Sequence, residues 1–197
     1  GLLLFKADSA YRIHDSNTGA YTTIDPSIGC GSNIGAINAY GRTYVASTRG
    51  IYWTDGLESM KEQTQLIEPF FHKDRINQNR PDLFCAGRFQ DRLYFSFPKV
   101  GESLNSLVVE VHPLQNWIMP HDNAASAYAS LRNTTEMVFG SPVNAGRVYN
   151  HGTGGADAGE DITSTLQTRW IEPRGGNLTR IRRVRFVGHG TFNATIL

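Results

Sequence analysis

The sequence is poor in cysteine, in excess charge of either sign and in long hydrophobic runs, and each shortage excludes a class of protein. It has 197 residues, only two cysteines, and 19 basic against 18 acidic residues, which leaves a net charge of +1. Two cysteines are too few for a metal cluster. The balanced charge gives no strong field to drive nucleic-acid binding through phosphate neutralisation. No segment approaches the ~20 consecutive apolar residues that a membrane-spanning helix needs, so we expect no membrane segment.

Two properties stay open from composition. Without a visible signal peptide, Cys30 and Cys85 favour free thiols in a reducing compartment, although a single disulfide between them is also compatible with the sequence. The chain starts at Gly1 rather than at an initiator methionine, and residues 191–197 have the pattern of a strand that does not end. We therefore expect the chain to be part of a longer polypeptide.

What the sequence does contain is a recurring unit: a short apolar and aromatic strand, a tight polar turn, and a second strand that ends on an aromatic residue. The clearest copies span residues 41–56 and 90–117, and fainter ones span 2–13 and 136–150. They begin roughly 40–50 residues apart, which is the period of a propeller blade. A hydrophobic fraction of 40% and an aromatic fraction of 11% indicate a packed core. The pattern predicts an all-β fold of β-propeller-like blades of short antiparallel strands.

We expect three parts along the chain. Residues 1–150 form the propeller-like blade region. Residues 151–161 form a linker, because they include four glycines and no apolar anchor. Residues 162–197 alternate at period two and are expected to add a C-terminal β segment like a β-sandwich. Within the blade region, residues 57–67 have little β-propensity and predict a short helix or an irregular connection.

The strand pattern also identifies an expected core. The residues that should lie largely buried between sheets are Tyr44, Val45, Ile51, Trp53, Leu93, Phe95, Val108 and Trp117.

No motif in the sequence carries catalytic or metal chemistry. The six histidines never stand three or four residues apart, as metal ligands often do. The glycine run at 152–155 lacks the Lys-Ser/Thr end of a phosphate-binding loop. Asp157, Glu160 and Asp161 lack the alternation of a calcium loop and favour a solvated linker over a weak calcium site. We therefore expect no enzyme activity, no cofactor and no resident metal.

Arginines are concentrated near the end of the chain, on consecutive expected strands. They are Arg169, Arg180, Arg182, Arg183 and Arg185. One role is contact with a polyanion or a neighbouring subunit, because guanidinium groups bind phosphates and carboxylates through paired donors. The other is a solvated strand face that blunts pairing between sheet edges. The sequence favours the two equally.

Three patterns together resemble one family. They are the GRxYVxSxxGIYxxDG segment at 41–56, the RLYFSF…LVVEV…W segment at 92–117 and the RIRRVRFVGHG segment at 180–190. In combination they resemble virion proteins of tailed bacteriophages, of the propeller-bearing tail hub, nozzle and DNA-stabilisation type. The resemblance covers most of the chain and rests on strand texture rather than on catalytic residues.

The resemblance implies a structural virion component that assembles in the tail hub or nozzle around the DNA channel. The implied partners are further copies in a homo-oligomeric ring, other tail or portal-adaptor proteins, and passing DNA through non-specific contact. The implied location is the virion tail, after synthesis in the host cytoplasm.

Two other functions remain open. The main alternative is an extracellular carbohydrate-binding or receptor-recognition propeller, which would line a concave surface with exposed aromatic residues. The other is a hydrolase on a propeller scaffold, which would need two or three converging carboxylates. An assembly protein instead buries its aromatic residues against a partner.

The arginine strands generate a first prediction. Arg183 and Arg185 alternate on one strand and present two guanidinium groups on the same face. If they contact an acidic partner surface, replacing both with glutamate blocks oligomer formation and leaves the circular dichroism spectrum unchanged. Oligomers that form at wild-type yield in light scattering would show that these arginines serve only to keep a strand soluble.

Overall fold

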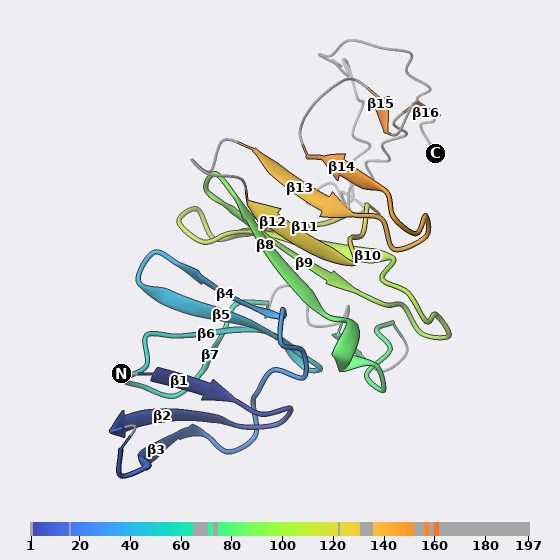
Figure 1. Cartoon of the computed structure of the whole chain (residues 1–197). Coiled ribbons are helices and arrows are strands. Elements are labelled where there is room, and N and C mark those ends of the chain that lie inside the picture. Colours follow the sequence, from blue (N-terminus) through green and yellow to red (C-terminus); the bar gives the residue numbers. More distant parts are fainter. Residues whose placement is uncertain are drawn as a thin grey trace, which may run out of the picture.

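The computed structural model describes residues 2–15, 17–64, 71–72, 75–121, 123–130 and 136–151, together with the backbone of 156–157 and 160–161. Of the described residues, 50% lie in strands and 3% are helical (Figure 1). The prediction of an all-β fold is confirmed. Among these residues, no helix is long and apolar enough to cross a membrane.

Four antiparallel sheets of three or four strands follow one another along the described chain, and each is a meander whose spatial order equals its sequence order. The first contains β1 (Leu2–Phe5), β2 (Ala10–Asp15) and β3 (Ala20–Asp25); the second contains β4 (Ala36–Ala39), β5 (Arg42–Ser47), β6 (Gly50–Thr54) and β7 (Lys61–Glu62). The third contains β8 (Cys85–Phe89), β9 (Arg92–Phe97), β10 (Leu107–His112) and β11 (Trp117–His121), and the fourth contains β12 (Ala127–Ser130), β13 (Met137–Gly140) and β14 (Val148–Asn150). A single 3₁₀ turn, η2 (Pro81–Leu83), precedes the third sheet in this part of the chain.

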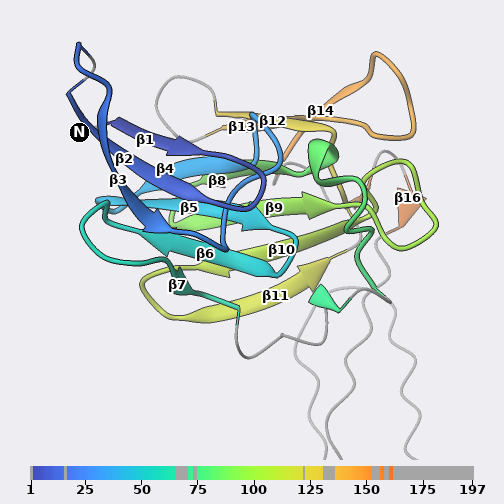
Figure 2. The same ribbon diagram turned by 90° about the horizontal axis from the view of Figure 1, so that it is seen from below.

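The sheets stack face to face in sequence order, from the first at the bottom of Figure 1 to the fourth at the top. Their first strands lie along the same side of the stack (Figure 2), and β8 contacts both β4 and β12. Meander sheets that pack face to face with their first strands adjacent are arranged like successive propeller blades. The blade-like organisation predicted for residues 1–150 is therefore present in the described part of the chain.

The largest core fills the space between the second and third sheets. Its fully buried members include Tyr44, Ala46 and Ile51 from the second sheet and Leu93, Phe95, Phe97, Val109 and Val111 from the third. Burial of such large side chains contributes roughly 1.5–3 kcal/mol each before the entropic cost of folding.

Two smaller cores fill the spaces on either side of the large one. Between the first and second sheets lie Ala10, Ile28, Cys30, Val45 and Met60; between the third and fourth lie Tyr94, Val108, Ala124 and Met137. Successive residues of a strand point to opposite faces. Neighbours such as Tyr44 and Val45 of β5 therefore enter different cores, and these strands are apolar on both faces because each face meets another sheet.

A glycine sets the approach of the fourth sheet to the third. A Cβ built on Gly87 of β8 would lie 2.4 Å from Cγ of Tyr128 in β12, which is too close for any side chain. The Tyr128 hydroxyl meanwhile hydrogen-bonds the hydroxyl of Ser96 in β9 at 2.7 Å. The missing side chain of Gly87 thus lets the Tyr128 ring lie directly on the neighbouring strand.

The first hairpin turn of the second sheet contacts the first hairpin turn of the third sheet through polar side chains. Tyr40 and Gly41 join β4 to β5 with φ values of 53° and 72°, the left-handed conformation of a two-residue hairpin turn. The Tyr40 hydroxyl donates a 2.8 Å hydrogen bond to Asp91, in the turn between β8 and β9. The Arg88 guanidinium lies 4.9 Å from the centre of the Tyr40 ring. The hairpin tips therefore add to the contact between the two sheets.

The predicted core is confirmed for most of its residues. Six of the eight are buried, and Trp53 and Trp117 are partly buried, with Trp53 packed against the largest core. The guanidinium of Arg42 lies 3.8 Å from the Trp53 ring centre, and that of Arg92 lies 5.3 Å from the Trp117 ring centre. Arginine covers part of each ring through cation–π contact, and the Trp53 ring also packs against the core between the second and third sheets.

Of the two predictions for residues 57–67, a short helix or an irregular connection, the helix is absent from the described part of that segment. Residues 57–64 contain bends and the strand β7, which pairs with Tyr52 and Trp53 of β6. The chain there completes the four-stranded second blade, because strand pairing provides backbone hydrogen bonds that outweigh a weak local propensity.

The remaining boundaries are described only in part. In the predicted linker, Ala156–Asp157 (β15) pairs with Glu160–Asp161 (β16) as a two-stranded ribbon. The C-terminal β segment predicted for 162–197 lies outside the described residues. Cys30 and Cys85 are both free and buried, which settles the open question of a disulfide. Burial raises the pKa of the Cys85 thiol to about 12, so it remains protonated.

The doubly apolar strands generate a stability prediction. Leu93 is fully buried in the largest core, so Leu93→Ala should lower the free energy of unfolding by about 2–5 kcal/mol. The matched control is Leu114→Ala, because Leu114 is 65% exposed and should change stability by no more than about 0.5 kcal/mol. Urea denaturation measures both. Equal effects of the two substitutions would contradict the assignment of β9 to an inter-sheet core.

Candidate functional site

The outer face of the first sheet carries exposed hydrophobic side chains. Leu2, Leu4 and Tyr21 are 62%, 46% and 65% exposed. Strand register places Leu4 opposite Tyr11, and places Ile13 between Leu2 and Tyr21. The five side chains therefore share one face of the sheet, which we call the outer blade face.

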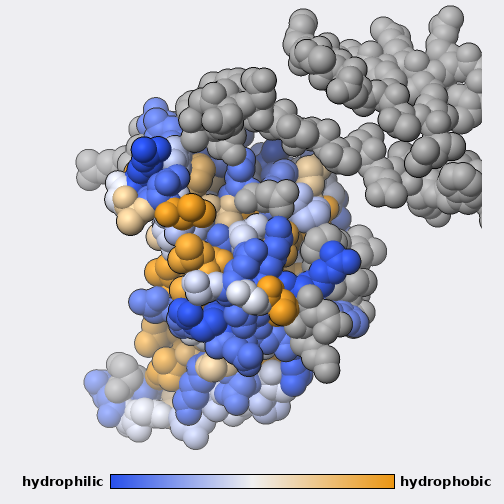
Figure 3. All heavy atoms as spheres, turned by 90° about the vertical axis from the view of Figure 1, so that its right-hand side faces the viewer, coloured by the Kyte–Doolittle hydropathy of each residue, from blue (hydrophilic) through white to orange (hydrophobic). Residues whose placement is uncertain are grey.

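The outer blade face is hollowed and partly ordered by its own aromatic residues. Leu4, Tyr11, Ile13 and Tyr21 line a shallow groove of about 320 Å³, with Lys6 at its edge. The Tyr11 and Tyr21 rings meet edge to face at 5.5 Å. Elsewhere on the molecule, the side seen in Figure 3 has hydrophobic residues along its left edge and hydrophilic residues over its middle. An apolar face such as the outer blade face is typical of a surface that packs against a partner.

A second feature is a small pocket between the third and fourth sheets, built around Glu110 of β10. Arg92 donates to Oε1 of Glu110 at 2.8 Å, and His121 Nε2 lies 2.6 Å from Oε2. The pocket encloses about 80 Å³, and Tyr94 and His151 contribute to its wall. The His151 ring packs against Tyr94 at 4.6 Å. A buried carboxylate is thus paired on both oxygens and surrounded by aromatic rings.

Electrostatics in this pocket follow from burial and pairing. Burial alone would raise the pKa of Glu110, but the hydrogen bond from His121 and the charge of Arg92 outweigh it and hold the pKa below its usual value. Burial and the nearby Glu110 charge raise the pKa of Tyr94 to about 12. Burial lowers the pKa of His151, with an opposing contribution from Glu110. At neutral pH the pocket therefore holds an ionised Glu110 and a neutral His151.

This arrangement is suited to holding two sheets together rather than to acid–base chemistry. Both oxygens of Glu110 are already bound, and Glu110 is the single acidic residue among the described ones that line the pocket. Glycoside hydrolysis needs a pair of carboxylates. In the described part of the chain, no three His, Cys, Asp or Glu side chains lie close enough to hold a metal ion.

The residues predicted as an interface from sequence lie elsewhere. Arg169, Arg180, Arg182, Arg183 and Arg185 are outside the described residues, so their contact role stays a prediction.

Sequence reasoning missed the Glu110 pocket. The sequence signal for this pocket was weak. Val108 pairs with His121 across β10 and β11, which makes Glu110 the diagonal neighbour of His121 on the same face. That relation depends on register, which the sequence alone did not specify.

Comparison with known proteins gives no family. No protein-family model matches the sequence, and no curated protein matches it. Function must therefore be argued from the surfaces just described.

The Glu110 pocket predicts a pH dependence of stability. The folded state favours neutral His151, so its contribution is complete above the ordinary pKa of 6.5 and declines as the pH falls below that value. The stability that ionised Glu110 contributes persists to a lower pH, because the pKa of Glu110 in the folded state lies below 4.5. Replacing His151 with phenylalanine keeps the aromatic packing and removes the titration. The variant should lose less melting temperature than the wild type between pH 7 and pH 5.5.

Calorimetry at both pH values measures this difference. The matched control is His14→Phe, since His14 is exposed on β2 and its ring hydrogen-bonds the side chain of Thr22, outside the Glu110 pocket. It should follow the wild type. An equal loss of melting temperature in wild type and His151→Phe would contradict the role of His151.

Proposed function

We propose that this chain is a structural virion component of a tailed phage, assembling as part of the tail hub or nozzle around the DNA channel. The observation that carries the proposal is the outer blade face of Leu2, Leu4, Tyr11, Ile13 and Tyr21. The sequence resemblance supplies the virion context, and the blade-like fold is compatible with it.

The arrangement of the sheets supports another sheet as the partner that packs on this face. The inner face of the first sheet packs on the second through Phe5, Ala10 and Ile24. The second and third sheets bury both of their faces in the same way. Only one face of the first sheet is left without such a neighbour among the described residues, and it has the apolar side chains that meet a sheet elsewhere.

We further propose that a second copy of the chain provides that neighbour. The fourth sheet forms the other end of the stack. It turns Tyr128, Phe139 and Tyr149 toward one side, and strand alternation places Val138 and Val148 on the opposite side. Val148 is 67% exposed. Contact between unlike ends of identical copies is heterologous, and a heterologous contact closes into a ring when its rotation allows. A ring is the form that surrounds a channel.

Light scattering on the purified chain, followed by negative-stain imaging, tests the proposal. The wild type should form oligomers with a ring outline. Leu4→Asp with Tyr21→Asp places two charges on the outer blade face and should weaken self-association at least tenfold, since burying an unpaired charge is costly.

The matched control is Leu114→Asp, because Leu114 is as exposed as Tyr21 but lies in the turn between β10 and β11. It should assemble like the wild type. A wild-type chain that stays monomeric at high concentration contradicts assembly through a second copy. Rings that survive Leu4→Asp with Tyr21→Asp contradict the use of this face.

A further inference from the structure

An open groove runs along one end of the contact between the third and fourth sheets, next to the Glu110 pocket. It has a volume of about 370 Å³, and its wall includes Asn105, Asn123, Phe139, Ser141, Asn144 and Tyr149. These residues come from three places in the chain: the loop before β10, the connection from β11 to β12, and the segment around β13 and β14. None of the described residues in the wall is charged. The groove therefore offers amide and hydroxyl groups without an ionic attraction.

One wall of the groove is aromatic. Phe139 and Tyr149 are cross-strand partners in β13 and β14, and their ring centres lie 5.6 Å apart. Both are half-buried, so each keeps part of its ring accessible. Aromatic rings of this kind bind the apolar C–H face of a flat ligand at small entropic cost.

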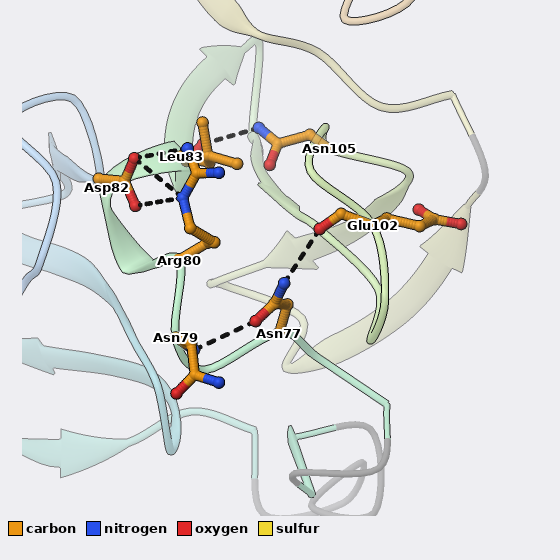
Figure 4. Close-up of polar contacts among 7 residues, drawn as sticks. All are labelled: Asn77, Asn79, Arg80, Asp82, Leu83, Glu102 and Asn105. Carbon is orange, nitrogen blue, oxygen red and sulfur yellow. Dashed lines mark hydrogen bonds and ion pairs between the residues drawn. The ribbon is translucent and has the colours of Figure 1, made fainter.

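Asn105, another residue of the groove wall, carries a buried hydrogen-bond acceptor. The Asn105 Nδ2 donates to the carbonyl oxygens of Leu83 at 2.7 Å and Ala125 at 2.8 Å. Figure 4 shows the bond from the Asn105 amide nitrogen to Leu83. These two bonds fix the orientation, because a flipped amide would set oxygen against oxygen. Asn105 is only 4% exposed, and its Oδ1 is buried without a hydrogen-bond partner among the described residues.

The surroundings of Asn105 are held in place by further polar contacts. Asn77 donates from Nδ2 to the carbonyl oxygen of Glu102 at 3.0 Å, and Arg80 pairs with Asp82 at 2.9 Å (Figure 4). The Asn77 bond joins the segment before β8 to the loop before β10, whereas the Arg80–Asp82 pair lies within the segment before β8. An unsatisfied buried acceptor is costly to a protein unless something else uses that acceptor.

We propose that this groove binds a neutral saccharide. A sugar ring has an apolar C–H face that fits Phe139 and Tyr149, and a hydroxyl edge that fits the amides of Asn123 and Asn144. Asn105 Oδ1 has almost no exposed surface, so a sugar hydroxyl can donate to it only after a small shift of the groove wall. Among the described residues of the wall, none would attract an anionic or a cationic ligand through an opposite charge. The groove lies on the side of the fourth sheet that carries Phe139 and Tyr149, opposite Val138 and Val148, and the outer blade face lies at the far end of the stack (Figure 1).

The groove and the Glu110 pocket adjoin, because Asn123 and Phe139 line both. The pocket is small, at about 80 Å³, and Glu110 within it is already paired with Arg92 and His121. The pocket can therefore receive one small substituent of the ligand but offers no free carboxylate. Binding without hydrolysis is the expected activity.

The test applies the purified chain to an array of neutral, acidic and sulfated oligosaccharides, followed by calorimetric titration of the strongest neutral glycan. We expect neutral glycans to bind and the titrated glycan to be recovered uncleaved. Val143→Arg should weaken its affinity at least tenfold, because Val143 lies in the groove wall, is 76% exposed and can be enlarged without disturbing the core. Tyr149→Ala should weaken it similarly.

The matched control is Val100→Arg, since Val100 is 49% exposed and does not belong to the described wall of the groove. It should bind like the wild type, and all variants should keep the wild-type circular dichroism spectrum. Absence of neutral glycan binding at millimolar concentration overturns the proposal, as does binding of charged glycans only. Binding that Val143→Arg leaves intact overturns it as well. Loss of self-association in the Leu4 and Tyr21 variant has no bearing on these outcomes.

Discussion

The constraint on which the structure depends is that its central strands are apolar on both faces. In β5, β9 and β10, alternate residues enter different cores: Tyr44 and Val45 point to opposite sides, and so do Leu93 and Tyr94. A sheet with two apolar faces cannot leave either one in water without losing roughly 25 cal/mol for each Å² exposed. The second and third sheets must therefore lie between other sheets, and a series of stacked blades results.

The same constraint explains where function can reside. Stacking satisfies the inner sheets, so what remains available is at the ends of the stack and in the seams between sheets. The outer blade face of the first sheet is such an end, and its Leu2 and Tyr21 are more than half exposed. The groove beside Asn105 is such a seam. We propose that the first contacts a flat apolar partner and that the second binds a small uncharged ligand.

The fold could be predicted from sequence wherever alternation decided it. Six core residues were found because strand alternation and turn signals around them agree. Trp53 is only partly buried, and the Arg42 guanidinium that covers its ring comes from a neighbouring strand, so the local pattern gave no sign of it. The strand β7 was missed because pairing with β6, rather than propensity, creates it. The Glu110 pocket needed the register of β10 on β11, which only the folded chain specifies.

Amide hydrogen exchange, followed by mass spectrometry on the native protein, tests the stacked-blade account most directly. Strands with two buried faces open only when sheets separate, so β5, β9 and β10 should exchange most slowly. The strands β1, β3 and β14, at the ends of the stack, should exchange at least tenfold faster at low protein concentration. Uniform exchange across all four sheets, or faster exchange in β9 and β10 than in β1, would contradict the account.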